Sequence, residues 1–129
     1  MKESQEILAP ISLGELIDKI TILQIKANHL KKNALDNVKT ELSALETTLN
    51  NLKIDVNPML IESLKATNEK LWSIEDMIRD HERQKKFDGE FISLARSIYQ
   101  QTDNRSAIKR QINITYGSSL IEEKSYEAY

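Results

Sequence analysis

The chain has 129 residues, no cysteine and a formal net charge of −2, from 18 basic and 20 acidic side chains. The lack of cysteine excludes disulfides and thiolate metal sites, and the charge balance makes a dedicated nucleic-acid binder unlikely, because such proteins carry a clustered basic surface. No uncharged run approaches the roughly 20 residues that span a bilayer, and the N-terminal residues lack the apolar segment of a signal peptide, so we expect a cytoplasmic protein without a membrane segment.

Three glycines and two prolines leave few places for turns, which favours long helices joined by short loops. The length suits one domain over residues 1–129, with an irregular arm over 1–11 and a C-terminal tail over 118–129. We predict an all-α helical bundle of four to five helices. Its first three helices should be antiparallel neighbours, its C-terminal pair should pack across them, and its first helix should be the most buried.

The first helix is predicted to begin after the first proline, at a capping box formed by Ser12 and Glu15. Its apolar stripe at helical spacing consists of Leu13, Leu16, Ile17, Ile20, Leu23, Ala27 and Leu30. Ile22 and Ile25 extend the apolar surface to a second side, so this helix should contact several neighbours or lie in a subunit interface. His29 is assigned a capping or solvent role, because no second histidine stands at metal-ligand spacing.

The second helix is predicted after a turn at residues 33–36. It carries the three-four spacing of Leu35, Val38, Leu42, Leu45, Leu49 and Leu52. This heptad pattern is too short for an independent coiled coil and favours an antiparallel hairpin with a neighbouring helix. Asn57 and Pro58 then provide the cap and first residue of a third helix, which should run to about Gln84. Its core stripe is Leu60, Leu64, Thr67, Leu71, Ile74 and Ile78.

A break is expected in the segment HERQKK, residues 81–86, which we interpret as a solvated charged loop rather than a phosphate-binding patch. Asp88 can cap a fourth helix. The core stripe of that helix is Phe91, Leu94, Ala95 and Ile98. Residues 102–104, Thr-Asp-Asn, form another cap signal and predict a fifth helix that Gly117 closes.

A second stripe on the third helix mixes the only tryptophan with opposite charges. It consists of Asn68, Trp72, Glu75, Arg79 and Glu82, with Asp76 beside it. We expect Trp72, Glu75 and Arg79 to lie near Arg96 and Tyr99, because each sits next to the core stripe of its own helix and antiparallel helices bring such stripes together.

Two interpretations of this stripe are open. It can be an anion-binding site for a nucleotide, a nucleotide sugar or a phosphorylated metabolite, with Trp72 or Tyr99 as a stacking surface. The cationic groups of that site would be Arg79, Arg96, Arg105, Lys109 and Arg110. The alternative is an ion-pair network, in which acidic side chains neutralise these cations along the bundle. Those acids would be Glu75, Asp76 and Glu82.

Four separated blocks of sequence carry a family resemblance and appear in order along nearly the whole chain. They are APISLGELIDKITIL, LWSIEDMIR, FDGEFISLAR with IYQQTDNRSAIKRQIN, and GSSLIEEKSY. Together they resemble a small family of uncharacterised bacterial and phage proteins, a domain of unknown function. The resemblance implies a compact single-domain protein and supplies no activity, cofactor or catalytic residue; residues 40–57 hold no matching block.

Three functions are compatible with these patterns. The favoured one is a non-enzymatic interaction or assembly module that forms a homo-oligomer, most simply a two-fold dimer, or docks on a protein partner. Its surplus apolar surface would include Ile22, Ile25 and Met77. The second is the anion-binding site. The third is a magnesium-dependent nucleotide pyrophosphohydrolase, although the paired-glutamate spacing typical of such enzymes is absent. Its carboxylates would be Glu69, Glu75, Asp76 and Asp80. We predict no bound cofactor and no metal ligand set beyond that third alternative.

Overall fold

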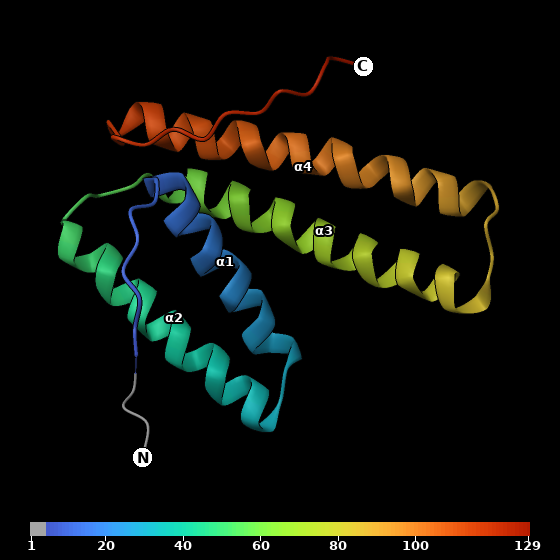
Figure 1. The fold of residues 1–129 in the computed structure, drawn as a ribbon, viewed down its shortest axis with the longest axis horizontal. Coiled ribbons are helices and arrows are strands. Elements are labelled where there is room, and N and C mark those ends of the chain that lie inside the picture. Colours follow the sequence, from blue (N-terminus) through green and yellow to red (C-terminus); the bar gives the residue numbers. More distant parts are fainter. Residues whose placement is uncertain (1–4) are drawn as a thin grey trace.

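The computed structural model describes residues 5–129, and this range contains four helices and no strand. The helices are α1 (Leu13–His29), α2 (Lys32–Leu52), α3 (Pro58–Gln84) and α4 (Gly89–Thr115). Figure 1 shows them as two antiparallel hairpins, α1 with α2 and α3 with α4, the first lying across one end of the second. The predicted all-α class is therefore confirmed. Of the predicted N-terminal arm, residues 5–11 are not helical, and residues 1–4 lie outside the described range.

Three of the four helix starts follow the predicted caps. The side chains of Ser12, Asn57 and Asp88 each accept a hydrogen bond from a backbone N–H of the first turn, at 3.1, 3.0 and 3.0 Å. The start of α2 differs, because Lys31 precedes it without a side-chain cap. The chain reverses within the extended residues Leu30 and Lys31, so residues 33–36 belong to the helix and the predicted turn there is wrong.

The predicted fifth helix is the second half of α4, which continues without a break through residues 102–104. The side chains that suggested a cap have other partners. Asp103 accepts a hydrogen bond from the Tyr129 hydroxyl at 2.6 Å, and Asn104 donates to the Gln101 side chain at 3.4 Å. A cap signal in a sequence is local, whereas α4 is held as one helix by packing along α3.

The core lies where α1 crosses the second hairpin. Ile17, Leu64 and Ile112 meet there and are almost fully buried. Helix α1 packs against each of the other three helices, which explains its wide apolar surface, and the prediction that it is the most buried helix is confirmed. Within residues 5–129 the backbone of α2 approaches only α1, so the predicted antiparallel pairing of the second and third helices is wrong.

We call residues 72–108 of the α3–α4 hairpin the distal arm. Most of this segment extends beyond α1, and no further helix covers it there (Figure 1). No residue of the distal arm is buried. The buried residues of α3 all precede it, and those of α4 all follow it. They are Leu64, Thr67, Asn68 and Leu71 in α3, and Lys109, Ile112 and Asn113 in α4.

Residues 118–129 have no regular structure and run back along α4 (Figure 1). Polar contacts hold this tail to α1 and to α4. The Ser118 hydroxyl accepts a hydrogen bond from the Leu13 N–H at 3.2 Å, and Glu123 pairs with Arg110 at 3.0 Å. No helix within the described part of the chain is long and apolar enough to cross a membrane.

Candidate functional site

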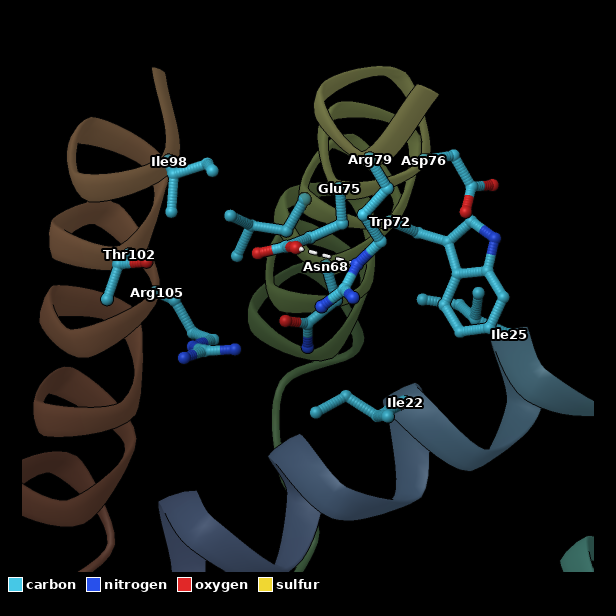
Figure 2. A pocket seen from close by; sticks show the side chains of 11 residues that line it. Ile22, Ile25, Asn68, Trp72, Glu75, Asp76, Arg79, Ile98, Thr102 and Arg105 are labelled. Carbon is cyan, nitrogen blue, oxygen red and sulfur yellow. Dashed lines mark ion pairs between the residues drawn. The ribbon is translucent and has the colours of Figure 1, made fainter. Parts of the chain in front are cut away.

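A cavity of about 370 Å³ lies between α1, α3 and α4, at the base of the distal arm (Figure 2). Its lining consists of Ile22, Ile25, Asn68, Leu71, Trp72, Glu75, Asp76, Arg79, Ile98, Thr102 and Arg105. Apolar walls with a few charged groups are typical of pockets that bind small molecules.

Trp72 forms one wall of the cavity and is held by a stacking contact from α1. Its indole lies 4.7 Å from the His29 ring between ring centres, with an interplanar angle of 26°. His29 therefore packs against the tryptophan. The indole Nε1 is buried without a hydrogen-bond partner within residues 5–129. An unpaired buried N–H costs about 1–3 kcal/mol, so an acceptor that reached this nitrogen would bind favourably.

The charged residues of the cavity do not form the predicted ion-pair network. Arg79 pairs with Glu75 at 3.4 Å, one helical turn away. The Arg79 side chain is 71% exposed and that of Glu75 is 43% exposed, and such pairs stabilise a fold by only about 0–1 kcal/mol. Among the described residues Arg105 has no carboxylate partner, and Glu82 pairs with Lys85 on the surface instead. Figure 2 shows the Arg105 guanidinium extending from α4 towards the cavity.

The structure brings together Trp72, Glu75, Arg79 and Arg105, whereas the predicted proximity of Arg96 and Tyr99 to them is wrong. In α4 the side that faces the cavity carries Ile98, Thr102 and Arg105. Arg96 is exposed, and Tyr99 packs edge-on against Tyr129 of the tail, with ring centres 5.1 Å apart. Each residue advances about 100° around a helix, so positions next to the core stripe lie on either of its two sides.

Lys109 does not reach the cavity and is not available to bind an anion. It is 7% exposed, and its Nζ lies 2.6 Å from Glu15, 3.3 Å from Glu122 and 3.9 Å from Asp18. Burial by itself lowers the pKa of the Lys109 ammonium, but the hydrogen bond to Glu15 and the surrounding carboxylates outweigh this effect and raise the pKa. The predicted assignment of Lys109 to the anion site is therefore corrected: it joins α1, α4 and the tail.

The Glu15 carboxylate has the complementary shift. Burial by itself raises the pKa of this carboxyl, but the hydrogen bond and the charge of Lys109 hold the pKa below its ordinary value. Glu15 was predicted as the second member of a capping box. Its side chain instead crosses to α4, which leaves the Ser12 hydroxyl as the cap of α1.

A buried polar tie beside the cavity was missed from the sequence. Asn68 Nδ2 donates to Asp18 Oδ1 at 2.9 Å and to Thr21 Oγ1 at 3.0 Å, which joins α3 to α1. Asn113 Oδ1 accepts from the Gly14 N–H at 2.6 Å and joins α4 to α1. The available signal was the presence of Asp18 and Thr21 within an otherwise apolar helical surface, since buried polar groups need partners.

The four carboxylates of the predicted magnesium site do not converge. Asp80 pairs with Arg83, and Glu75 pairs with Arg79. Within residues 5–129 no three of Glu69, Glu75, Asp76 and Asp80 lie close enough to share an ion. Helical carboxylates must converge on one position to hold magnesium, and no three of these do so within the described residues.

The comparisons with known proteins give a family. No curated protein and no solved structure matches the chain. A family model with the description "Family of unknown function (DUF6165)" matches residues 7–129, which agrees with the resemblance seen in the four sequence blocks. The chain therefore belongs to the DUF6165 family of unknown function.

Proposed function

We propose that the protein is a non-enzymatic interaction module that pairs with a second copy of itself through the distal arm. The observation that carries this proposal is that no residue from 72 to 108 is buried, although the arm has apolar residues at core spacing. These residues are Ile74, Ile78, Phe91, Leu94 and Ile98. Two helices alone leave each other's sides in water, and stable bundles cover those sides with a further layer.

The exposed area of the chain supports the same proposal. The chain exposes 9512 Å², whereas a compact monomer of its 14.9 kDa would expose roughly 7,000 Å². The difference is roughly three times the roughly 800 Å² that each partner buries in a standard interface. The distal arm, α2 and the extended terminal segments are the parts of the fold that contain few or no buried residues.

The surface proposed for pairing is a hollow on the side of the α3–α4 hairpin opposite the cavity, with a volume of about 520 Å³. Met77, which is 45% exposed, and Ile74 supply its apolar centre. Glu69 and Lys70 place one charge of each sign on its rim, and a two-fold axis can pair these charges in both directions. This self-complementary pair of charges favours a second copy of the chain over a partner whose surface carries charges of one sign.

Of the three residues expected to supply the interface, Met77 alone lies on this surface. Ile25 is 3% exposed and belongs to the core of one chain, while Ile22 is half-buried and lines the cavity. The wide apolar surface of α1 is covered within the chain by the three helices that pack against it.

Light scattering over a range of protein concentrations tests the pairing. Met77→Glu should weaken the dimer at least about tenfold, or about 1.4 kcal/mol, because it places a charge in an apolar hollow. Ile92→Glu is the matched control, since Ile92 is also apolar, is 56% exposed and does not line the hollow. A wild-type protein that stays monomeric up to about 1 mM would refute the proposal, because a dissociation constant of about 1 mM corresponds to a binding free energy of only about 4 kcal/mol. Equal weakening of the dimer by both substitutions would show that the interface does not lie at this hollow.

Binding of a small amphipathic anion in the cavity is a second candidate function, and the unpaired Arg105 supports it. A guanidinium without a carboxylate partner, beside Trp72 and apolar walls, suits a carboxylate or phosphate attached to an apolar or aromatic group. The volume of about 370 Å³ falls within the range of small-molecule pockets, roughly 300–1,000 Å³.

A thermal-shift screen of nucleotides, nucleotide sugars, sugar phosphates and aromatic carboxylates tests this second candidate. A ligand that binds only the native state raises the melting temperature by mass action. Arg105→Ala should remove that shift, while Arg96→Ala should keep it, because Arg96 is exposed and lies outside the cavity. A flat screen on the wild type would reject the candidate for the compounds used.

A further inference from the structure

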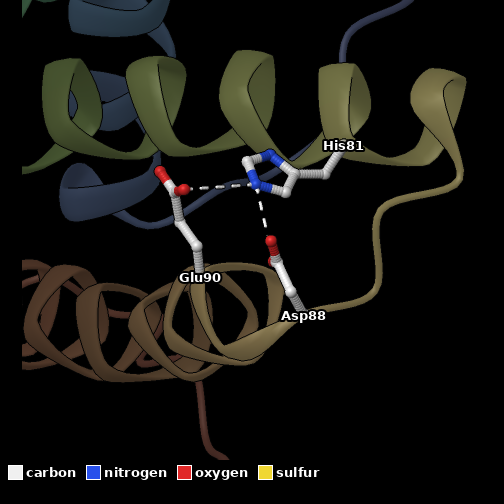
Figure 3. Close-up of side chains that lie close together, drawn as sticks. All are labelled: His81, Asp88 and Glu90. Atoms are coloured by element: carbon white, nitrogen blue, oxygen red, sulfur yellow. Dashed lines mark ion pairs between the residues drawn. The ribbon is translucent and has the colours of Figure 1, made fainter.

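Three side chains that the preceding proposals do not use converge at the tip of the distal arm (Figure 3). His81 lies in the last turn of α3, and Asp88 and Glu90 lie at the start of α4, so the turn between the helices brings them together. His81 Nε2 is 3.8 Å from Asp88 Oδ1 and 3.6 Å from Glu90 Oε2. The three potential ligand atoms all lie within 4.8 Å of one another.

The histidine is oriented so that its free lone pair faces the two carboxylates. His81 Nδ1 lies 3.0 Å from the Met77 carbonyl oxygen, which can only accept a hydrogen bond. Nδ1 of a neutral ring therefore carries the proton, and Nε2 is an acceptor. Such a hydrogen bond from the distal ring nitrogen to a backbone carbonyl is the usual support of a metal-binding histidine. The side chain of His81 is only 13% exposed, which holds the ring in this position.

The distances between the three groups suit a shared cation better than hydrogen bonds. Separations of 3.6 and 3.8 Å exceed the roughly 3.2 Å limit of a good N–H···O bond. Two ligands on a tetrahedral zinc ion, each at about 2.1 Å, are about 3.4 Å apart. A small inward movement of the exposed Glu90 side chain would complete that geometry. Asp88 is held in place by its role as the cap of α4, and the backbone hydrogen bond from Phe91 keeps the pKa of its carboxyl low.

We propose that His81, Asp88 and Glu90 form a binding site for a divalent transition-metal ion, with zinc as the best match. One imidazole nitrogen and two carboxylate oxygens are ligands that zinc accepts, whereas magnesium and calcium prefer oxygen alone. The three side chains leave a fourth position open to water. A bound ion ties the end of α3 to the start of α4, so it stabilises the tip of the distal arm.

Isothermal titration of metal-free protein with Zn²⁺ tests the site, and Co²⁺ absorption reports the coordination geometry. We expect one ion per chain, a raised melting temperature with Zn²⁺, and a tetrahedral Co²⁺ spectrum. Glu90→Gln should weaken Zn²⁺ binding at least about tenfold without changing the melting temperature of the metal-free protein, because this side chain is 69% exposed. Asp88→Asn should weaken binding similarly, since asparagine preserves the cap and removes the charge.

His29→Gln is the control for zinc binding to an unsupported histidine, because His29 stacks on Trp72 and belongs to no group of converging ligands within residues 5–129. Its affinity for Zn²⁺ should equal that of the wild type, whereas His81→Gln should abolish binding. The proposal is overturned if the wild type shows no binding at Zn²⁺ concentrations up to about 1 mM. It is also overturned if His29→Gln removes the binding or Glu90→Gln leaves it unchanged.

Discussion

Replacing Gly14 with alanine tests the close approach of α1 to α4. Gly14 lies in the first turn of α1, and its N–H donates to the Asn113 side chain at 2.6 Å. A Cβ at this position would lie 2.5 Å from the backbone oxygen of Lys109 and 3.0 Å from Asn113 Oδ1. The nearest of these atoms belongs to the backbone of α4, so the contact can be relieved only by moving the two helices apart.

Two opposing effects set the size of the change. Alanine favours a helix over glycine by up to about 1 kcal/mol, and less than this near a helix end. Overpacking against a fixed backbone costs about 1–3 kcal/mol, and weakening the buried hydrogen bond to Asn113 costs about 1 kcal/mol more. The steric effect is the larger, so Gly14→Ala should lower the free energy of unfolding by about 1–3 kcal/mol.

Urea unfolding followed by far-ultraviolet circular dichroism measures this difference. Gly89→Ala is the matched control, because Gly89 is the first residue of α4 and a Cβ there would meet nothing within 4 Å. That variant should be as stable as the wild type or up to about 1 kcal/mol more stable. A Gly14→Ala protein as stable as the wild type would refute the close contact, and equal losses in both variants would point to an effect of helix starts in general.

Further predictions concern the buried charges, a helix end and the uneven core. Lys109→Met should lower the free energy of unfolding by about 3 kcal/mol in urea titrations at neutral pH, since it leaves buried carboxylates without their cation; an unchanged midpoint would contradict this. The folded pKa of Glu15 lies below its ordinary 4.5, so its contribution to stability is present above about pH 4.5 and is lost as the pH falls through the folded pKa. Unfolding titrations across that range should show the loss in the wild type and a smaller loss in Lys109→Met. Lys53→Gly should raise the melting temperature by an amount equivalent to up to about 1 kcal/mol, because Lys53 ends α2 with a φ of 54°; a lower melting temperature would argue against the left-handed conformation. In the monomer at low protein concentration, Leu64→Ala should lower the free energy of unfolding by about 3 kcal/mol and Leu94→Ala by about 1 kcal/mol, because Leu64 is fully buried and Leu94 only partly. Equal losses would mean that the distal arm is covered.

The helical class and most helix ends could be predicted from the sequence. Apolar residues at three-four spacing predict where each helix buries a side, and the caps at Ser12, Asn57 and Asp88 act within a few residues of themselves, so both can be read locally. The same locality produced the main error. Asp103 and Asn104 have the composition of a cap, but their side chains bond to Tyr129 and Gln101 and α4 continues.

For the cavity, the sequence correctly grouped Trp72, Glu75 and Arg79, because these share one side of a single helix. Which residues of α4 face them depends on the rotation of that helix about its axis, and packing against α3 and α1 decides this. Arg105 therefore faces the cavity, while Arg96 and Tyr99 lie outside it.

Which charged groups are neutralised depends on how the helices pack. Lys109 is buried among Glu15, Asp18 and Glu122, two of which are far from it in the sequence, whereas Arg105 has no acidic partner within residues 5–129. Tertiary structure also placed Met77 on a surface without a covering layer and brought His81 to the start of α4. Charge pairing and burial depend on distances between helices. A sequence pattern shows which residues share a side of one helix, but it does not show how far apart two helices lie. These distances are therefore known only from the packed structure.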